Sequence, residues 1–399
     1  MKVKGSWGEV GILVVELDRF ERRSAVTADI SIRLGRRVFL RNRLASNHLT
    51  PEASGYVPPM TAPIRSADWI LDLEEPVSTL SLSPDGTRVV VLGIEGNGWV
   101  VDVVLGAILQ RFKGHEGGGF QTRWNPVKDC FATSGQDGVI RIWDAIQCTV
   151  LESFSTGSAW GEQLAWSPNG ECLAAGAGKE LTLWRAQSGV VHRLRDQQST
   201  ITALAWRHDG SRIASACYGG VTFFDPVTGQ NSESLPWKSS LLSLAISPDQ
   251  RWVVAGTQEM SVQIWPTPFI EGEELAMSGY AAKVRELAWH HSSRYLATGG
   301  GDEIMVWDCG GRGPAGSTPR ILEGHADRLS ALAYQHRGHL LASGGQDGSV
   351  IFWNAGKSSQ ALRQIRLSST VTALAWTPDD RRVLAGLQDG RLAAATPLG

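Results

Sequence analysis

The chain has 399 residues, a formal net charge of −2, 42% hydrophobic residues and 20% charged residues. A hydrophobic fraction of this size excludes wholesale disorder, and without a basic excess the chain is not expected to be a dedicated nucleic-acid-binding protein. The 45 glycines and 16 tryptophans indicate many tight turns and one recurring aromatic packing position.

Residues 1–59 show no repeat and carry ten basic and six acidic residues. Three interpretations stay open: a poorly ordered tail, a basic arm that docks on an acidic partner, or an artefact of start-site choice, because Met60 stands just before the first regular strand. The apolar run at residues 10–15 is too short to cross a bilayer and lacks the cleavage site of a signal peptide. We therefore expect no membrane contact and a cytoplasmic location. The five cysteines form no CxxC pair, which favours small buried side chains in a reducing compartment.

From residue 77 onward the chain repeats itself. Short runs such as ALAW at 203–206, ELAW at 286–289 and ALAW at 373–376 recur every 40 to 45 residues. Eight copies share this period, and the residues that mark it are Leu82, Trp124, Trp166, Trp206, Ile246, Trp289, Tyr334 and Trp376. A fixed period of this length is typical of repeat architectures.

Each copy has the same internal order. A run ending in the period-marking residue is followed by a polar turn, a small-residue run, a turn rich in Gly or Asp, and a third run such as VIFW at 350–353. Runs of four to six residues bounded by turn formers are strands. With a fourth, less regular run, each copy supplies four antiparallel strands, which predicts an all-β propeller.

The stretch at residues 324–353, GHADRLSALAYQHRGHLLASGGQDGSVIFW, contains a full set of polar markers. The chain resembles WD40-repeat proteins over residues 68–399. The resemblance implies that a His, a Ser or Thr, an Asp and a Trp form a hydrogen-bond network within one blade. The matching sets are His325, Ser343, Asp347 and Trp353 in the seventh repeat and His115, Thr133, Asp137 and Trp143 in the second. Because the set recurs at one place in the repeat, it is interpreted as structural and not as catalytic.

Eight repeats predict an eight-bladed WD40-like β-propeller over residues 60–399, with seven blades as the alternative if the first or last repeat is irregular. The last repeat is the doubtful one, since Ala385 and Ala395 replace its Ser/Thr and Trp. It also ends after three strands, which leaves a raw edge. We expect residues 69–73 to supply the fourth strand, so that an N-terminal strand closes the ring.

No enzymatic constellation stands out, and no catalytic residue, cofactor or metal site is predicted. His290 and His291 sit in a polar turn without a third ligand nearby in the sequence. The main function expected is a non-enzymatic scaffold. The alternative is a propeller enzyme such as a quinone-cofactor dehydrogenase. A third option, a ubiquitin-ligase substrate receptor, lacks support because no Trp-Asp-x-Arg follows a third strand.

The resemblance implies that partners dock on the end of the propeller formed by the links between repeats and the turns between second and third strands. Two groups of side chains are expected there: an aromatic patch of Phe120, Trp160 and Tyr218, and a basic patch of Lys283, Arg285 and Arg328. Other expected contact residues are Glu162, Gln136, Gln258, Gln346 and Gln388.

Exposed aromatic and arginine side chains are typical of binding hot spots. We therefore expect a monomeric propeller that works within a complex and binds a protein or peptide with an apolar anchor and acidic groups. The alternative is that these are ordinary rim residues, with Trp160 packed against its neighbour.

Overall fold

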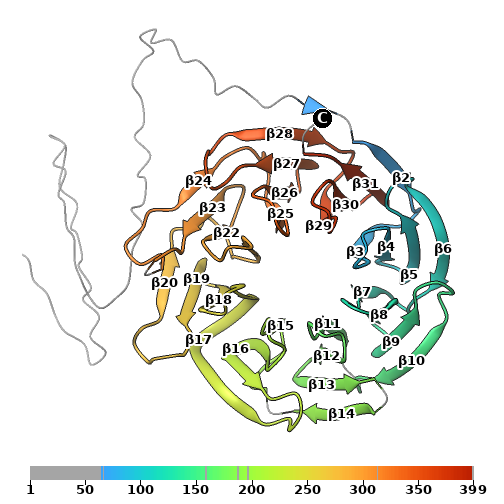
Figure 1. Ribbon diagram of the computed structural model, residues 1–399, viewed down its shortest axis with the longest axis horizontal. Coiled ribbons are helices and arrows are strands. Elements are labelled where there is room, and N and C mark those ends of the chain that lie inside the picture. Colours follow the sequence, from blue (N-terminus) through green and yellow to red (C-terminus); the bar gives the residue numbers. More distant parts are fainter. Residues whose placement is uncertain are drawn as a thin grey trace, which may run out of the picture. The chain divides into compact units, whose positions relative to one another are not determined.

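The computed structural model describes residues 64–65, 67–157, 160–186, 188–195, 197–311 and 313–397. The extension expected at residues 1–59 lies outside these ranges. All regular elements in the described ranges are strands, which form a ring of sheets around a central axis (Figure 1). Within the same ranges, no helix is long and apolar enough to cross a membrane.

The inner strand of a repeat lies next to the axis and ends at the period-marking residue. Its side chains point alternately to the two faces of the sheet: in the strand Ala203–Trp206, Leu204 packs with residues of the third repeat, and Ala203 and Ala205 pack with residues of the fifth. In seven repeats the inner strand is a separate element: β3 (Val77–Leu82), β7 (Gly119–Trp124), β11 (Gly161–Trp166), β15 (Ala203–Trp206), β21 (Glu286–Trp289), β25 (Leu329–Tyr334) and β29 (Val371–Trp376).

The second strands are the most buried elements, because sheets pack against both of their faces. Every residue of the strands at Cys130–Gly135, Cys172–Ala177 and Trp252–Thr257 is buried. Small and β-branched residues suit this position. The second strands are β4 (Arg88–Gly93), β8 (Cys130–Gly135), β12 (Cys172–Ala177), β18 (Trp252–Thr257), β22 (Tyr295–Gly299), β26 (Leu341–Gly345) and β30 (Val383–Leu387).

Third strands are largely buried, whereas the outer strands face solvent along much of their length. The third strands are β5 (Asn97–Asp102), β9 (Val139–Asp144), β13 (Glu180–Arg185), β19 (Ser261–Pro266), β23 (Ile304–Asp308), β27 (Ser349–Trp353) and β31 (Arg391–Ala395). The outer strands are β2 (Trp69–Asp72), β6 (Ala107–Lys113), β10 (Val150–Ser155), β14 (Gly189–Leu194), β20 (Leu275–Ser278), β24 (Arg320–Leu322) and β28 (Ala361–Arg366).

The described strands form seven hydrogen-bonded sheets, so the expected count of eight separate blades is wrong and the alternative of seven holds, although the first and last repeats each form a four-stranded sheet and are not irregular as that alternative supposed. The reason lies in the fourth and fifth repeats, which share a six-stranded sheet in the order β15-β16-β17-β18-β19-β20. Its long strands are β16 (Ile213–Phe224) and β17 (Asn231–Ile246). β17 pairs first with β16 and then with β18. The link between these two repeats thus stays extended and paired along its length, and no break separates their sheets.

An N-terminal strand closes the ring, as the sequence predicts. β2 pairs antiparallel with β31, with Trp69 opposite Ala394 and Asp72 opposite Arg391. In addition, β1 (Ile64–Arg65) pairs in parallel with β28 at the edge of the seventh repeat, which the sequence did not predict. The inner strands β29 and β3 also contact each other, so the two ends of the repeat region meet.

Three of the five period-marking tryptophans tie neighbouring repeats together through a hydrogen bond. The indole N–H of Trp166 donates to the carbonyl of Arg123 at 3.0 Å, and that of Trp376 donates to the carbonyl of Ala333 at 2.9 Å. Trp206 makes the same bond to Ala165 at 3.0 Å. A buried indole needs an acceptor for its N–H, and the neighbouring inner strand provides it. The indole N–H groups of Trp124 and Trp289 have no such acceptor among the described residues, so the hydrogen bond accounts for only part of the recurring aromatic position.

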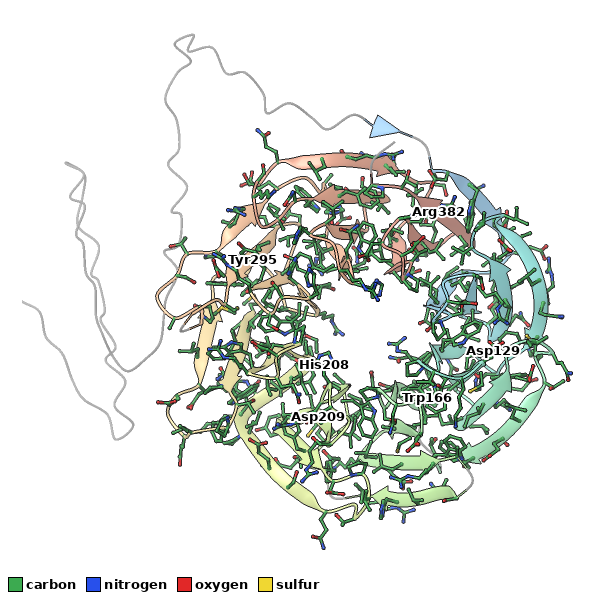
Figure 2. The ribbon with its side chains drawn as sticks, viewed as in Figure 1. Asp129, Trp166, His208, Asp209, Tyr295 and Arg382 are labelled. Carbon is green, nitrogen blue, oxygen red and sulfur yellow. The ribbon has the colours of Figure 1, made fainter. Side chains whose placement is uncertain are left out.

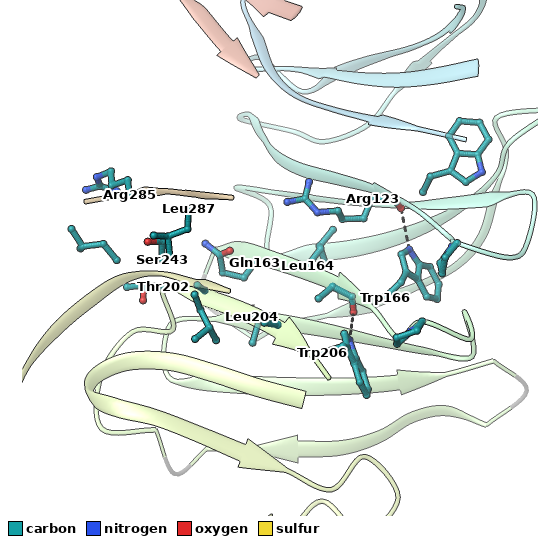
Figure 3. Close-up of a pocket in the computed structure, with 18 residues that line it drawn as sticks. Arg123, Gln163, Leu164, Trp166, Thr202, Leu204, Trp206, Ser243, Arg285 and Leu287 are labelled. Atoms are coloured by element: carbon teal, nitrogen blue, oxygen red, sulfur yellow. Dashed lines mark hydrogen bonds between the residues drawn. The ribbon is translucent and has the colours of Figure 1, made fainter. Parts of the chain in front are cut away.

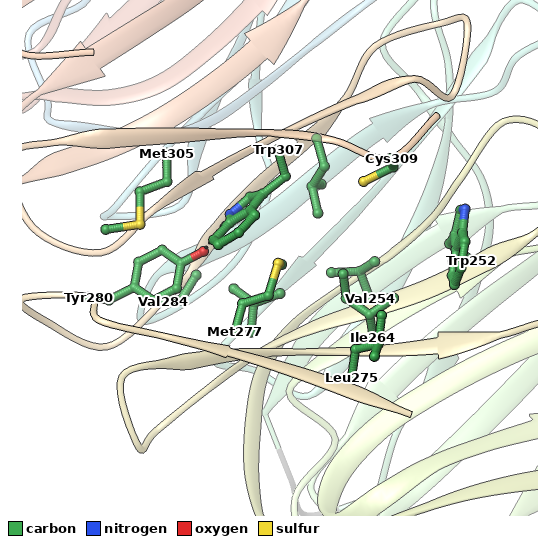
Figure 4. Close-up of a cluster of buried hydrophobic side chains, with 12 residues drawn as sticks. Trp252, Val254, Ile264, Leu275, Met277, Tyr280, Val284, Met305, Trp307 and Cys309 are labelled. Atoms are coloured by element: carbon green, nitrogen blue, oxygen red, sulfur yellow. Dashed lines mark hydrogen bonds between the residues drawn. The ribbon is translucent and has the colours of Figure 1, made fainter. Parts of the chain in front are cut away.

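Hydrophobic side chains fill the space between adjacent sheets. Figure 4 shows one such cluster, in which Val254 and Ile264 of the six-stranded sheet pack against side chains of the sixth repeat such as Trp307. Trp307 is 1% exposed and Ile264 is fully buried. Each sheet therefore depends on its neighbours for the burial of its faces, as repeat architectures do.

Candidate functional site

The four expected glutamines define one end of the ring, here called the glutamine end. Their backbone N–H groups donate to carbonyls in the links between repeats: Gln136 to Gly118 (2.9 Å), Gln258 to Ser240 (3.1 Å), Gln346 to Arg328 (2.8 Å) and Gln388 to Thr370 (2.9 Å). These bonds hold the turns after the second strands beside the links that lead into the inner strands. All four glutamine residues are exposed.

The aromatic patch contains one ring pair. Phe120 precedes Trp124 on β7, and its ring lies 5.7 Å from that of Trp160 at an angle of 42°. Trp160 nevertheless keeps 54% of its surface exposed, and Tyr218 keeps 51%. Among the described residues, Tyr218 makes no ring contact with the other two. Glu162 is half-buried on β11, two residues beyond Trp160. The structure thus joins Phe120 and Trp160 and places Tyr218 separately, on β16.

Lys283, Arg285 and Arg328 of the basic patch are all exposed. They lie in the links that lead into β21 and β25. In the described part of the chain, no carboxylate forms an ion pair with any of these three side chains. Free positive charges of this kind are available to an acidic ligand, since they need not break an existing pair.

A cavity of about 580 Å³ lies among the inner strands β7, β11, β15, β17 and β21. Figure 3 shows Arg285 and Arg123 among its lining residues, together with Gln163, Thr202 and Ser243. None of the described residues that line it is acidic. Burial lowers the pKa of Arg123, because desolvation disfavours the charged guanidinium. Because Arg285 of the basic patch and Arg123 both line the cavity and no acidic residue among the described lining offsets them, the positive charge of the basic patch extends into the cavity.

Small hydroxyl side chains near the start of the inner strands connect adjacent repeats. Ser78 donates to the carbonyl of Phe120 at 3.1 Å, Thr202 to that of Leu241 at 2.8 Å, and Ser330 to that of Val371 at 2.5 Å. These positions stabilise the ring. Phe120, Glu162 and Arg285 occupy the equivalent positions in other repeats, where a larger side chain is available for contact.

The markers of the seventh repeat form a continuous buried network. The indole N–H of Trp353 donates to Ser343 Oγ at 2.9 Å. His325 Nδ1 donates to the Asp347 carboxylate at 3.2 Å, which leaves Nε2 of a neutral imidazole to accept from the Ser343 hydroxyl at 2.8 Å. The second repeat has the same contacts: Trp143 to Thr133, His115 to Thr133 and His115 to Asp137, each at 2.8 Å.

Charge in these networks is held on the aspartates. Burial raises the pKa of Asp347, but the hydrogen bonds from His325 and from two backbone N–H groups outweigh it and hold the pKa well below its usual range. Burial lowers the pKa of His115, although Asp137 partly opposes the shift. These groups have their hydrogen-bonding capacity occupied within the blade, which is consistent with a structural role.

Two repeats use substitutes for histidine. In the sixth repeat, Tyr280 Oη accepts from the Trp307 indole at 3.0 Å and contacts Thr298 Oγ1 at 2.8 Å. In the fourth repeat, Gln197 Oε1 accepts from Ser215 at 2.9 Å. Tyr280 is apparent in the sequence, whereas the role of Gln197 depends on its packing.

Glu286 was not singled out from the sequence. It lies on the inner strand β21, where other repeats carry Ala203, Ala331 or Ala373. Burial raises its pKa to about 7. A charged residue in an otherwise apolar inner strand is the signal that marks this position.

The residues best able to hold a metal are three histidines at the opposite end of the ring. The ligand atoms of His290, His291 and His339 all lie within 4.8 Å of one another. His339 comes from the repeat after that of His290 and His291, so a search for neighbours in the sequence does not find it.

Parts of the chain match models of known protein families. The family model "WD domain, G-beta repeat" matches residues 106–144, 273–308 and 316–354. The model "Anaphase-promoting complex subunit 4 WD40 domain" matches residues 164–255. The three WD segments fall in the second, sixth and seventh repeats, whose buried tryptophans have the hydrogen bonds described above.

Among curated proteins, WD repeat-containing protein slp1 of Schizosaccharomyces pombe is 24% identical over 229 residues, which are 55% of this chain and 46% of slp1. Protein HIR1 of Cryptococcus neoformans is 32% identical over 91 residues, 19% of this chain and 10% of HIR1. The chain thus spans about half or less of the length of these relatives. The computationally designed Ika8 protein superposes with a TM-score of 0.70 and 23% identity, covering 83% of this chain and 98% of Ika8. That likeness concerns the fold.

Proposed function

Because this chain belongs to the WD40-repeat family, we propose that it is a non-enzymatic platform that binds a protein or peptide partner at the glutamine end. The partner has an apolar anchor beside acidic groups. The observation that carries the proposal is the combination of half-exposed Trp160 and Tyr218 with three exposed basic side chains in the loops of this end, which pair with no carboxylate of the described residues.

The chemistry of the end supports this choice of partner. An aromatic ring that is already in contact with a neighbour, as Trp160 is with Phe120, loses little rotamer freedom when it is covered. Tryptophan and arginine dominate binding energies at protein interfaces. Acidic groups on the partner would pair with Lys283, Arg285 or Arg328 and extend toward the cavity that Arg285 lines.

Several finer expectations belong to the same proposal. The binding domain comprises residues 60–399, and residues 1–59 form a basic extension. The protein works in the cytoplasm as one propeller within a complex, and its five free, buried cysteines are consistent with a reducing compartment. No observation on the described residues favours the alternative of a quinone-cofactor dehydrogenase, and we assign no catalytic residue.

The proposal is tested by affinity capture from lysates of the source cells, with quantitative mass spectrometry of the retained proteins. Wild type is compared with the double variant Trp160→Ala and Arg285→Glu. We expect the double variant to lose the specific set, because each change removes an expected hot-spot contact and the second also reverses a charge.

A matched control carries similar changes at the opposite end: Ile146→Ala and Arg381→Glu. Ile146 is 64% exposed in the turn between β9 and β10, and the Arg381 side chain is 84% exposed in the turn between β29 and β30. This control should retain the wild-type set. An identical set on all three proteins would overturn the assignment of the glutamine end.

A further inference from the structure

Three histidines from two neighbouring repeats meet at the end of the ring opposite the glutamine end. His290 and His291 follow β21 directly in the turn toward β22, and His339 lies in the turn between β25 and β26. His290 is 4% exposed, whereas His291 and His339 are exposed. The arrangement combines one fixed imidazole with two that are open to solvent.

Packing orients the buried ring. His290 lies edge-on against Tyr295 and Tyr334, with centroid distances of 5.9 and 5.3 Å and interplanar angles of 84° and 85°. The ring of His339 stacks parallel to it at 5.3 Å, and the ring of His291 lies 4.2 Å away. His290 Nε2 is 3.1 Å from His339 Nδ1. In a tetrahedral zinc site with Zn–N bonds of about 2.0–2.1 Å, two ligand nitrogens lie about 3.3 Å apart. The two nitrogens thus already have nearly the separation that a shared metal requires.

The second ring nitrogen of His290, Nδ1, has a hydrogen-bond partner of the kind that metal-binding histidines use. Ser292 Oγ lies 2.7 Å from His290 Nδ1. When Nδ1 carries the proton and donates it to Ser292, Nε2 presents its lone pair toward His339. The contact that the backbone N–H of Ser292 makes with Nδ1 at 3.1 Å would then be given up. Metal-bound histidines usually donate their second N–H to such an outer partner.

We propose that His290, His291 and His339 form a binding site for a divalent transition-metal cation such as Zn²⁺, which bridges the sixth and seventh repeats. Imidazole is a preferred ligand of such cations. The metal replaces the proton now shared between His290 Nε2 and His339 Nδ1. The exposed side of the site leaves a fourth position for water or for a donor from another molecule.

The site is tested on the full chain without a histidine tag, after treatment with a chelator. Co²⁺ is titrated in while its visible absorption is followed, and Zn²⁺ is then added as competitor. One equivalent of Co²⁺ is expected to bind and to be displaced by Zn²⁺. Because an outer partner alone contributes about 10–100-fold to affinity, Ser292→Ala should weaken binding about tenfold and His339→Ala roughly 100-fold or more. Zn²⁺ should also raise the melting temperature of wild type and not that of His339→Ala, since a ligand that binds the folded state stabilises it.

His208→Ala is the matched control. His208 is exposed in the corresponding turn of the fourth repeat, directly after Arg207 as His291 follows His290. Its loss should leave Co²⁺ binding unchanged. Circular dichroism of each variant establishes that it is folded, and His291→Ala replaces His339→Ala if the latter is not. Absence of Co²⁺ binding by wild type, or equal affinities in wild type and the folded ligand variant, would overturn the proposal.

Discussion

Replacing Ser343 with alanine removes the hydroxyl at the centre of the network in the seventh repeat. The change leaves the Trp353 indole N–H without its acceptor at 2.9 Å and His325 Nε2 without its donor at 2.8 Å. Trp353 is fully buried and His325 is 7% exposed, so water does not readily take the place of the hydroxyl. A buried polar group left unsatisfied costs about 1–3 kcal/mol. With two such groups, we expect Ser343→Ala to lower the free energy of unfolding by about 3 kcal/mol.

Ser134→Ala provides the matched control. Ser134 is also fully buried on a second strand, but its hydroxyl has no hydrogen-bond partner among the residues that the structure describes. Removing it should change the free energy of unfolding by less than about 1 kcal/mol. Urea unfolding of both variants, followed by tryptophan fluorescence and circular dichroism, gives the difference from the midpoints when the m-values agree. Equal destabilisation by the two substitutions would refute the reasoning, because it would assign the cost to packing and not to the network.

Three further predictions concern charge, thiols and closure. The folded-state pKa of Glu286, about 7, lies above its unfolded value, so the stability present below the unfolded pKa is lost as pH rises through 7. Glu286→Gln should therefore leave the free energy of unfolding unchanged near pH 4 and raise it by about 3 kcal/mol at pH 8. Urea unfolding at both pH values measures the difference between variant and wild type, and a difference that does not change with pH would contradict the prediction. Burial raises the pKa of Cys130 to about 11, and all five cysteines are free and buried, so Ellman's reagent at pH 8 should find no reactive thiol until the protein unfolds, whereupon it should find five. Trp69→Ala should lower the free energy of unfolding by about 3 kcal/mol in urea, because Trp69 packs in the closing sheet and its indole N–H donates to the carbonyl of Val103 at 3.2 Å. Ile70→Ala should have little effect, because the Ile70 side chain is 54% exposed. Similar losses of stability from both substitutions would argue against closure by this strand.

The sequence predicts much of the fold because each repeat contains its own turn signals and one aromatic at a fixed place. The indole of Trp166 shows why the pattern is reliable: its N–H has an acceptor only on the adjacent inner strand, so the period reports a contact between repeats. The closing strand was predicted for a related reason, since three strands in the last repeat leave an unpaired edge that another segment must cover.

The sheet count was harder to predict, because it depends on whether a strand bends or breaks. In β17 the pairing shifts from Tyr218–Ser240 to Leu241–Thr257, and this shift is a matter of three-dimensional register that the sequence does not reveal. Candidate site residues that depend on neighbouring repeats were missed for the same reason. His339 reaches His290 only because the two turns lie at the same end of adjacent sheets, 49 residues apart in the chain.

The most direct test of the proposed platform is to map which end of the ring touches a captured partner. A photo-crosslinking amino acid is placed at Gln346, at the glutamine end, or at Arg381, at the opposite end; both residues are exposed. Irradiation in lysate of the source cells should then attach a partner through position 346 and not through position 381. Attachment only through position 381 would contradict the account.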